Sequence, residues 1–91
     1  MEITKDFFSQ LILDINNVKF SRKLFKAYNI QEVDEFLEDL INNLANNTDF
    51  TYKLKRLENL INEKNFSFSI SGYNMKEVNE FLDYLLKKIK V

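Results

Sequence analysis

Apolar residues recur every three or four positions in four stretches of the chain, and this spacing predicts four α-helices. In the clearest stretch, apolar residues stand at offsets of 0, 3, 4, 7, 8 and 11 from Val33, which is one continuous face of a helix. The same pattern begins again at Val78. We predict helices at about residues 5–17, 30–45 and 50–64, and from residue 75 onward.

The two clearest stretches belong to an internal repeat. Residues 28–44 read YNIQEVDEFLEDLINNL and residues 73–89 read YNMKEVNEFLDYLLKKI, with eight of the seventeen positions identical. Each copy begins with an asparagine at the N-cap position and a glutamate three residues later, a pattern close to a capping box. A Phe-Ser pair stands in the segment before each copy, at Phe20-Ser21 and Phe66-Ser67.

The repeat predicts the fold. Because the third helix must retrace the length of the second, we expect helices two and four to run parallel, with one and three antiparallel to them. We therefore predict an all-α fold, a four-helix bundle of two helix-loop-helix repeats (1–46 and 47–91) related by a pseudo-twofold axis within one domain, 1–91. Phe66, Phe68 and Ile70 alternate with serines as in a short strand, but no partner strand is evident, so we expect an extended loop.

Composition narrows the function classes. The chain has no cysteine and no histidine, which excludes disulfides, thiolate metal sites and the commonest general base. No apolar run approaches the ~20 residues of a membrane span, and no Gly-rich phosphate loop is present. The net charge of −1 gives no reason to expect nucleic acid. We expect a cytoplasmic, non-enzymatic protein with no cofactor and no metal.

The repeated residues carry a resemblance that spans nearly the whole chain. They are Phe20, Tyr28, Glu32, Val33, Asp34, Phe36, Leu37 and Glu38, then Phe66, Gly72, Tyr73, Glu77, Val78, Asn79, Phe81, Leu82 and Asp83. Both copies resemble the N-terminal module of the DivIVA/GpsB family of bacterial cell-division and cell-pole scaffolds. In that family, modules from two chains form a parallel dimer that continues into a coiled coil. No such extension is seen here, and the tandem suggests a monomeric pseudo-dimer, with a swapped dimer left open.

The resemblance implies a loop that contacts the membrane. The family loop presents an aromatic and an adjacent basic residue, which here are Phe25 and Lys26, with Arg22, Lys23 and Leu24 beside them. Cations near an anionic bilayer surface contribute about 1 kcal/mol each. The alternative is that Leu24 and Phe25 cap the end of the bundle while the basic residues are merely solvated.

The resemblance also implies a groove along the capped helix that receives arginine-bearing peptides of cell-wall enzymes. The matching residues are Tyr28, Asp34 and Glu38 in the first copy, and Tyr73 and Asp83 in the second. The second repeat has Asn79 where the first has Asp34, so we expect it to bind more weakly or not at all.

The acids of the second helix point to the same site independently. Asp34 with Glu38, and Glu35 with Asp39, are like charges four residues apart, which cost a few tenths of a kcal/mol each. This helix therefore needs cations from elsewhere. They are either arginines of a partner or the bases of the third helix, which are Lys53, Lys55 and Arg56.

These observations predict an adaptor or scaffold of the DivIVA/GpsB type. It would bind a basic, arginine-bearing segment of a cell-division or cell-envelope protein, with its loop at the inner face of the cell membrane. One alternative is a structural subunit covered by another protein chain. A small helical nucleic-acid-binding protein is less favoured, because the loops exceed the ~3–4-residue turn of a helix-turn-helix.

Overall fold

The structure is a computed structural model that describes residues 5–46 and 49–90. Its elements follow the order α1 (Lys5–Asn17), β1 (Arg22–Tyr28), α2 (Ile30–Asn46), α3 (Phe50–Glu63), β2 (Phe68–Asn74) and α4 (Met75–Ile89). The helices begin and end within one residue of their predicted bounds, because the apolar period and the caps are local signals.

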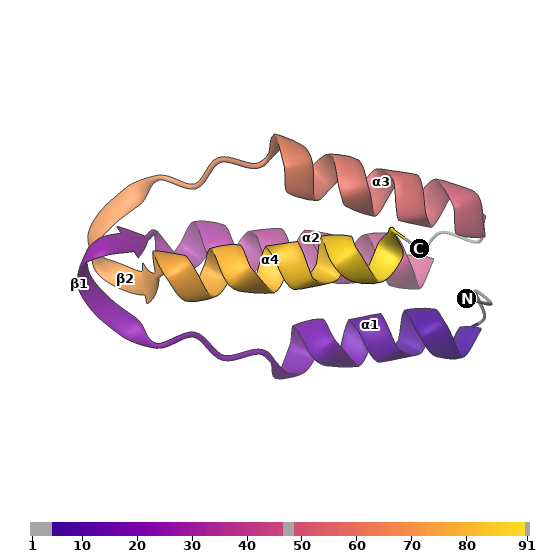
Figure 1. Cartoon of the computed structure of the whole chain (residues 1–91), viewed down its shortest axis with the longest axis horizontal. Helices are drawn as coiled ribbons and strands as arrows, with labels where there is room; N and C mark the ends of the chain where they lie inside the picture. The colour runs from indigo at the N-terminus through magenta and orange to yellow at the C-terminus, as the bar shows by residue number, and fades with distance from the viewer. Residues whose placement is uncertain (1–4, 47–48, 91) are drawn as a thin grey trace.

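The helices lie along the long axis of a molecule that measures 41 × 19 × 17 Å (Figure 1). The α2 and α4 helices run in the same direction, away from the strands, while α1 and α3 run toward them on either side. The course of the four helices is the one that the repeat predicts.

The all-α prediction is wrong, because the structure also contains a two-stranded sheet and is an α+β fold. The strands β1 and β2 cross at one end of the molecule (Figure 1). Over most of their length the partner numbers run in opposite directions, from Arg22 opposite Tyr73 to Tyr28 opposite Phe68, so this pairing is antiparallel. At their carboxyl ends the strands also meet each other, with Tyr28 opposite Tyr73, where both lead into parallel helices.

The two segments before α2 and α4 are each other's partner strand, which neither sequence indicates by itself. The backbone N–H of Asn29 donates to the carbonyl of Ser67 at 3.0 Å, and that of Asn74 donates to Ser21 at 2.9 Å. The strand β1 has one extra residue between Leu24 and Ala27, a β-bulge. Within this bulge Phe25 and Lys26 have positive φ angles of 62° and 47°.

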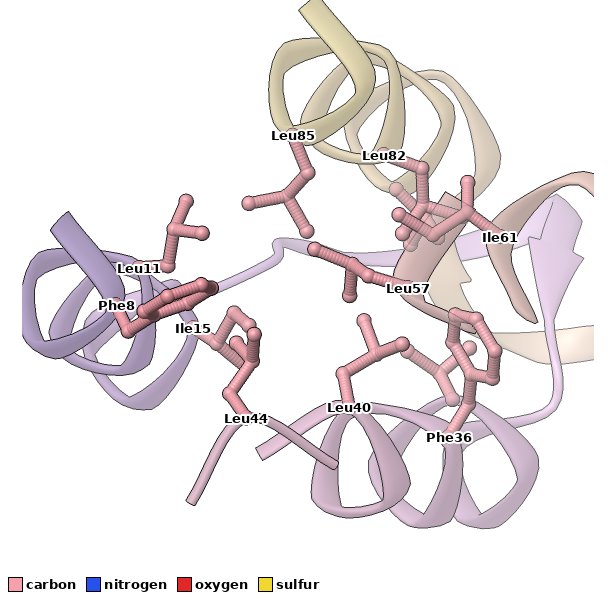
Figure 2. Packing of buried hydrophobic residues seen from close by; sticks show 12 residues of the cluster. Phe8, Leu11, Ile15, Phe36, Leu40, Leu44, Leu57, Ile61, Leu82 and Leu85 are labelled. Carbon is pink, nitrogen blue, oxygen red and sulfur yellow. The ribbon is translucent and has the colours of Figure 1, made fainter. Parts of the chain in front are cut away.

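One hydrophobic core joins the two repeats. In Figure 2 Leu57 of α3 lies between Leu40 of α2 and Leu85 of α4, and all three are fully buried. Phe8 of α1 closes the core beside Leu44. The buried apolar residues of α2 and α4 belong to this one cluster, and α3 packs against both helices.

The predicted N-caps are present. The side chain of Asn29 accepts a hydrogen bond from the N–H of Glu32 at 3.0 Å. The side chain of Asn74 accepts from Lys76 and Glu77, and Asp49 caps α3 by accepting from Tyr52. These caps fix the point at which each strand turns into its helix.

Candidate functional site

The capping glutamates bind the opposite repeat. The backbone N–H of Ser67 donates to the Glu32 carboxylate at 2.8 Å, and that of Ser21 donates to Glu77 at 2.7 Å. The bond from Ser67 is the main reason that the pKa of the Glu32 carboxyl is lowered from its ordinary value of 4.5. In a capping box each glutamate would accept a hydrogen bond from the N–H of its own N-cap asparagine. Here the glutamates accept instead from Ser67 and Ser21, because the crossed strands bring these serines of the opposite repeat to the helix ends.

The two repeated tyrosines are exchanged in the same way. The hydroxyl of Tyr73 donates to Asp34 at 2.8 Å, and that of Tyr28 donates to Asn79 at 2.9 Å. Asp34 and Asn79 hold the same position in the two copies. The tyrosine beside Asp34 is therefore Tyr73 rather than Tyr28, the residue that the sequence grouped with it. We call these the first tyrosine site (Arg22, Asp34, Glu38, Tyr73) and the second tyrosine site (Tyr28, Phe68, Asn79, Asp83).

The first tyrosine site already holds a guanidinium group. Arg22 lies over the ring of Tyr73, with its Cζ 5.5 Å from the ring centroid, a cation–π arrangement. Phe20 contacts the same ring at a centroid distance of 5.4 Å. Partial burial, the hydrogen bond to Asp34 and the charge of Asp34 raise the pKa of Tyr73 above its ordinary 10.0, and Arg22 opposes this. The phenol is thus a neutral donor at physiological pH.

Four acids of α2 form no ion pair within residues 5–46 and 49–90. Asp34, Glu35, Glu38 and Asp39 are exposed, and none lies in an ion pair with another described residue. Two of the three bases of α3, Lys53 and Lys55, contact other groups. The Lys53 ammonium is buried over the Phe8 ring, Lys55 pairs with Glu58, and Arg56 borders a hollow with Asp39 outside ion-pair distance. Within the described residues no base of α3 forms an ion pair with these acids, although Arg56 and Asp39 line the same hollow.

The second tyrosine site borders a hollow of about 620 Å³. The ring of Phe68, 77% exposed, lies nearly parallel to that of Tyr28 at a centroid distance of 6.2 Å, and the ring of Phe66 lies 5.1 Å from the same ring. Phe68 holds the place that Arg22 has in the first site. Asn79 and Asp83 form the edge of this hollow toward α4.

The tip of the crossed strands is exposed and apolar. Leu24 and Phe25 are each 67% exposed, so they do not cap the core, and that alternative is excluded. Phe68 and Ile70 of β2 add exposed fractions of 77% and 71% at the same end. Sequence reasoning assigned the tip to the first loop alone and missed Phe68 and Ile70. Their alternation with serines was the signal, and only the pairing of the strands shows its meaning.

The described residues contain no group of three or more His, Cys, Asp or Glu side chains arranged to hold a metal ion. None of the helices among them combines the length and apolar character needed to cross a bilayer. The exposed features of the described chain are the first tyrosine site, the second tyrosine site and the apolar tip of the crossed strands.

Comparison with protein-family models, with curated proteins and with solved structures returned no match.

Proposed function

We propose that this protein is a non-enzymatic adaptor, resembling the DivIVA/GpsB module, that binds a short arginine-bearing segment of a cell-division or cell-envelope protein at the first tyrosine site. The single observation that supports this most is the position of Arg22. A guanidinium lies over the ring of Tyr73, whose hydroxyl donates to Asp34, so the face of this ring accommodates the group that the site would recognise.

The chemistry of α2 favours arginine over lysine. A carboxylate accepts two parallel hydrogen bonds from the planar guanidinium, whereas an ammonium is a point charge. Asp34 and Glu38 stand one helical turn apart and are exposed, so both are accessible to one segment. Affinity is modest, because exposed ion pairs contribute up to about 1 kcal/mol each.

The test is a titration of arginine-bearing peptides against wild type and Asp34→Asn. Asparagine still accepts the bond from Tyr73, as Asn79 does from Tyr28, so the variant removes charge and leaves the local structure in place. We expect binding roughly 3–5-fold weaker, the loss of one exposed ion pair. The matched control is Glu80→Gln on α4, an exposed acid away from this site. Equal binding by Asp34→Asn, or by a lysine peptide, would contradict the proposal.

A second candidate function is attachment to an anionic membrane, and the exposed tip favours it. Leu24, Phe25, Phe68 and Ile70 form the apolar surface, with Arg22, Lys23 and Lys26 beside it. We expect flotation with anionic vesicles that weakens with added salt and is lost in Phe25→Ala/Lys26→Ala. Neutral vesicles are the control. Flotation that survives the double change, or none at low salt, argues against this function.

A further inference from the structure

The two tyrosine sites have the same framework and opposite chemistry. In each, a phenol from one repeat donates to α2 or α4 of the other, at 2.8 Å and 2.9 Å. The acceptor changes from Asp34 to Asn79, and the side chain over the tyrosine ring changes from Arg22 to Phe68. The second site has therefore lost a negative charge and gained an exposed aromatic ring.

The surroundings of the second site are apolar on one side and basic on the other. The aromatic hollow beside Tyr28 has Leu82 and Leu86 among its lining residues. A second hollow of about 620 Å³ shares Asn79 and Asp83 with it, so the two meet along one edge of α4. Taken together, the charged residues that line one or both hollows are Lys23, Lys26, Lys64, Lys76, Glu80 and Asp83.

The charges at this edge favour an anion. Lys76 and Glu80 pair with each other at 3.8 Å, which leaves Lys23, Lys26 and Lys64 against Asp83 and, near Lys64, Glu32. The Lys64 ammonium lies over the Phe66 ring at 5.4 Å and extends the basic rim to the aromatic side. The bulge of β1 places Lys26 on the lysine-lined hollow, at a positive φ that L-residues rarely adopt.

We propose that the second tyrosine site binds a short acidic protein segment that carries an aromatic residue. Its aromatic side chain enters the hollow against Phe68 and Tyr28, and its carboxylates cross the Asn79 edge to meet Lys23 and Lys26. Aromatic contacts supply affinity and the lysines supply charge selection. The chain then binds segments of opposite charge on its two sides. This inference uses a different site from the arginine-binding proposal and can hold where that one fails, although it shares Phe68, Lys23 and Lys26 with the tip of the second candidate function.

The experiment is a titration of the isotope-labelled full chain with an acidic pentapeptide that has phenylalanine at its centre, followed by NMR chemical shifts. The shifts should concentrate at Phe68, Asn79 and Lys26. A peptide with alanine at its centre should bind at least about fivefold more weakly, because the hollow then stays empty. Saturation with the acidic peptide should leave the arginine peptide bound, since the sites are separate.

The decisive variant is Phe68→Arg/Asn79→Asp, which gives the second site the residues of the first. Both positions are exposed, so the fold is expected to survive, and a thermal melt checks this. The acidic peptide should lose about tenfold or more in affinity. Wild-type affinity in this variant, equal binding of the alanine peptide, or shifts confined to α2 would each overturn the proposal. The alanine-peptide comparison needs no variant and decides the question if the variant does not fold.

Discussion

At the scale of single residues, Asp34 and Asn79 have the same structural role but differ in charge. Both accept a hydrogen bond from a tyrosine of the other repeat, so both positions satisfy the same structural demand. Only Asp34 adds a charge. This is why exchange of the two residues tests binding without disturbing the packing around the tyrosines.

Gly72 is a second residue at this scale, because its position has no room for a side chain. A Cβ atom at this position would lie 2.1 Å from the carbonyl oxygen of Tyr28, in the region where the strands meet. Backbone atoms of a crossed strand have little freedom to move. We expect Gly72→Ala to lower the free energy of unfolding by roughly 1–3 kcal/mol. Urea denaturation measures this, with the exposed neighbour Ser71→Ala as the control. Equal midpoints for the two variants would contradict the prediction.

The Glu32 carboxylate predicts how stability depends on pH. Because its pKa is lower in the folded chain than its ordinary 4.5, it stabilises the fold above pH 4.5. This contribution is lost as the pH falls through the lower, folded value. Glu32→Gln keeps an oxygen acceptor for Ser67 but cannot titrate. We therefore expect the free energy of unfolding to fall less in this variant than in wild type, from about pH 6 to about pH 3. Identical pH profiles would count against the prediction.

At the scale of elements, the helices were predictable from sequence and the strands were not. A helix with one buried face repeats its apolar residues locally, as Val33, Phe36 and Leu40 do on α2. The strand β1 is exposed over its first five residues, so no buried face imposes an alternation on its sequence. Its pairing depends on a segment forty or more residues away, which no local pattern encodes.

The candidate site shows the same limit. Its tyrosines and acids were identified because the repeat marks them, and their spacing on the helices was clear. Which tyrosine meets which helix depends on the crossing of β1 and β2. That crossing carries Tyr73 to Asp34 and Tyr28 to Asn79. Composition and periodicity cannot distinguish this arrangement from one in which each tyrosine stays on its own repeat.

The two repeated phenylalanines differ in burial, and this predicts unequal effects. Phe36 is 4% exposed and contacts Phe66, whereas Phe81 is half-buried beside Phe20. We expect Phe36→Ala to cost roughly 3–5 kcal/mol of unfolding free energy, and Phe81→Ala less, roughly 2–3 kcal/mol. Chemical denaturation of both variants measures the difference. A larger loss for Phe81→Ala would show that the burial of these rings is wrongly assigned.

At the scale of the whole molecule, each repeat supplies part of the other. The Phe20-Ser21 loop is held by Tyr73, Glu77 and Phe81 of the second repeat. The equivalent Phe66-Ser67 loop is held by the first repeat in the same way, through Tyr28, Glu32 and Phe36. The crossing therefore converts two short repeats into one cooperative unit, because neither loop has its bonds without the other half.

This exchange predicts the behaviour of the two halves as separate peptides, residues 1–46 and 47–91. Each alone lacks the partner strand and half of the core, and two-helix units of this size are marginal in water. We expect low helicity by circular dichroism for each peptide, and recovery of helicity with a cooperative thermal transition in an equimolar mixture. Because association is bimolecular, the transition temperature should rise with concentration.

The control for this mixture is the 47–91 peptide carrying Gly72→Ala. Its added methyl group meets the Tyr28 carbonyl where the strands cross. It should recover less helicity with the first peptide at equal concentration, because the chains can no longer approach as closely. Two outcomes would contradict the exchange. One is a half that folds fully by itself, and the other is a mixture whose spectrum equals the sum of its parts. In the first case one repeat would fold without the crossed strands, and in the second the exchanged contacts would be too weak to bring the two halves together.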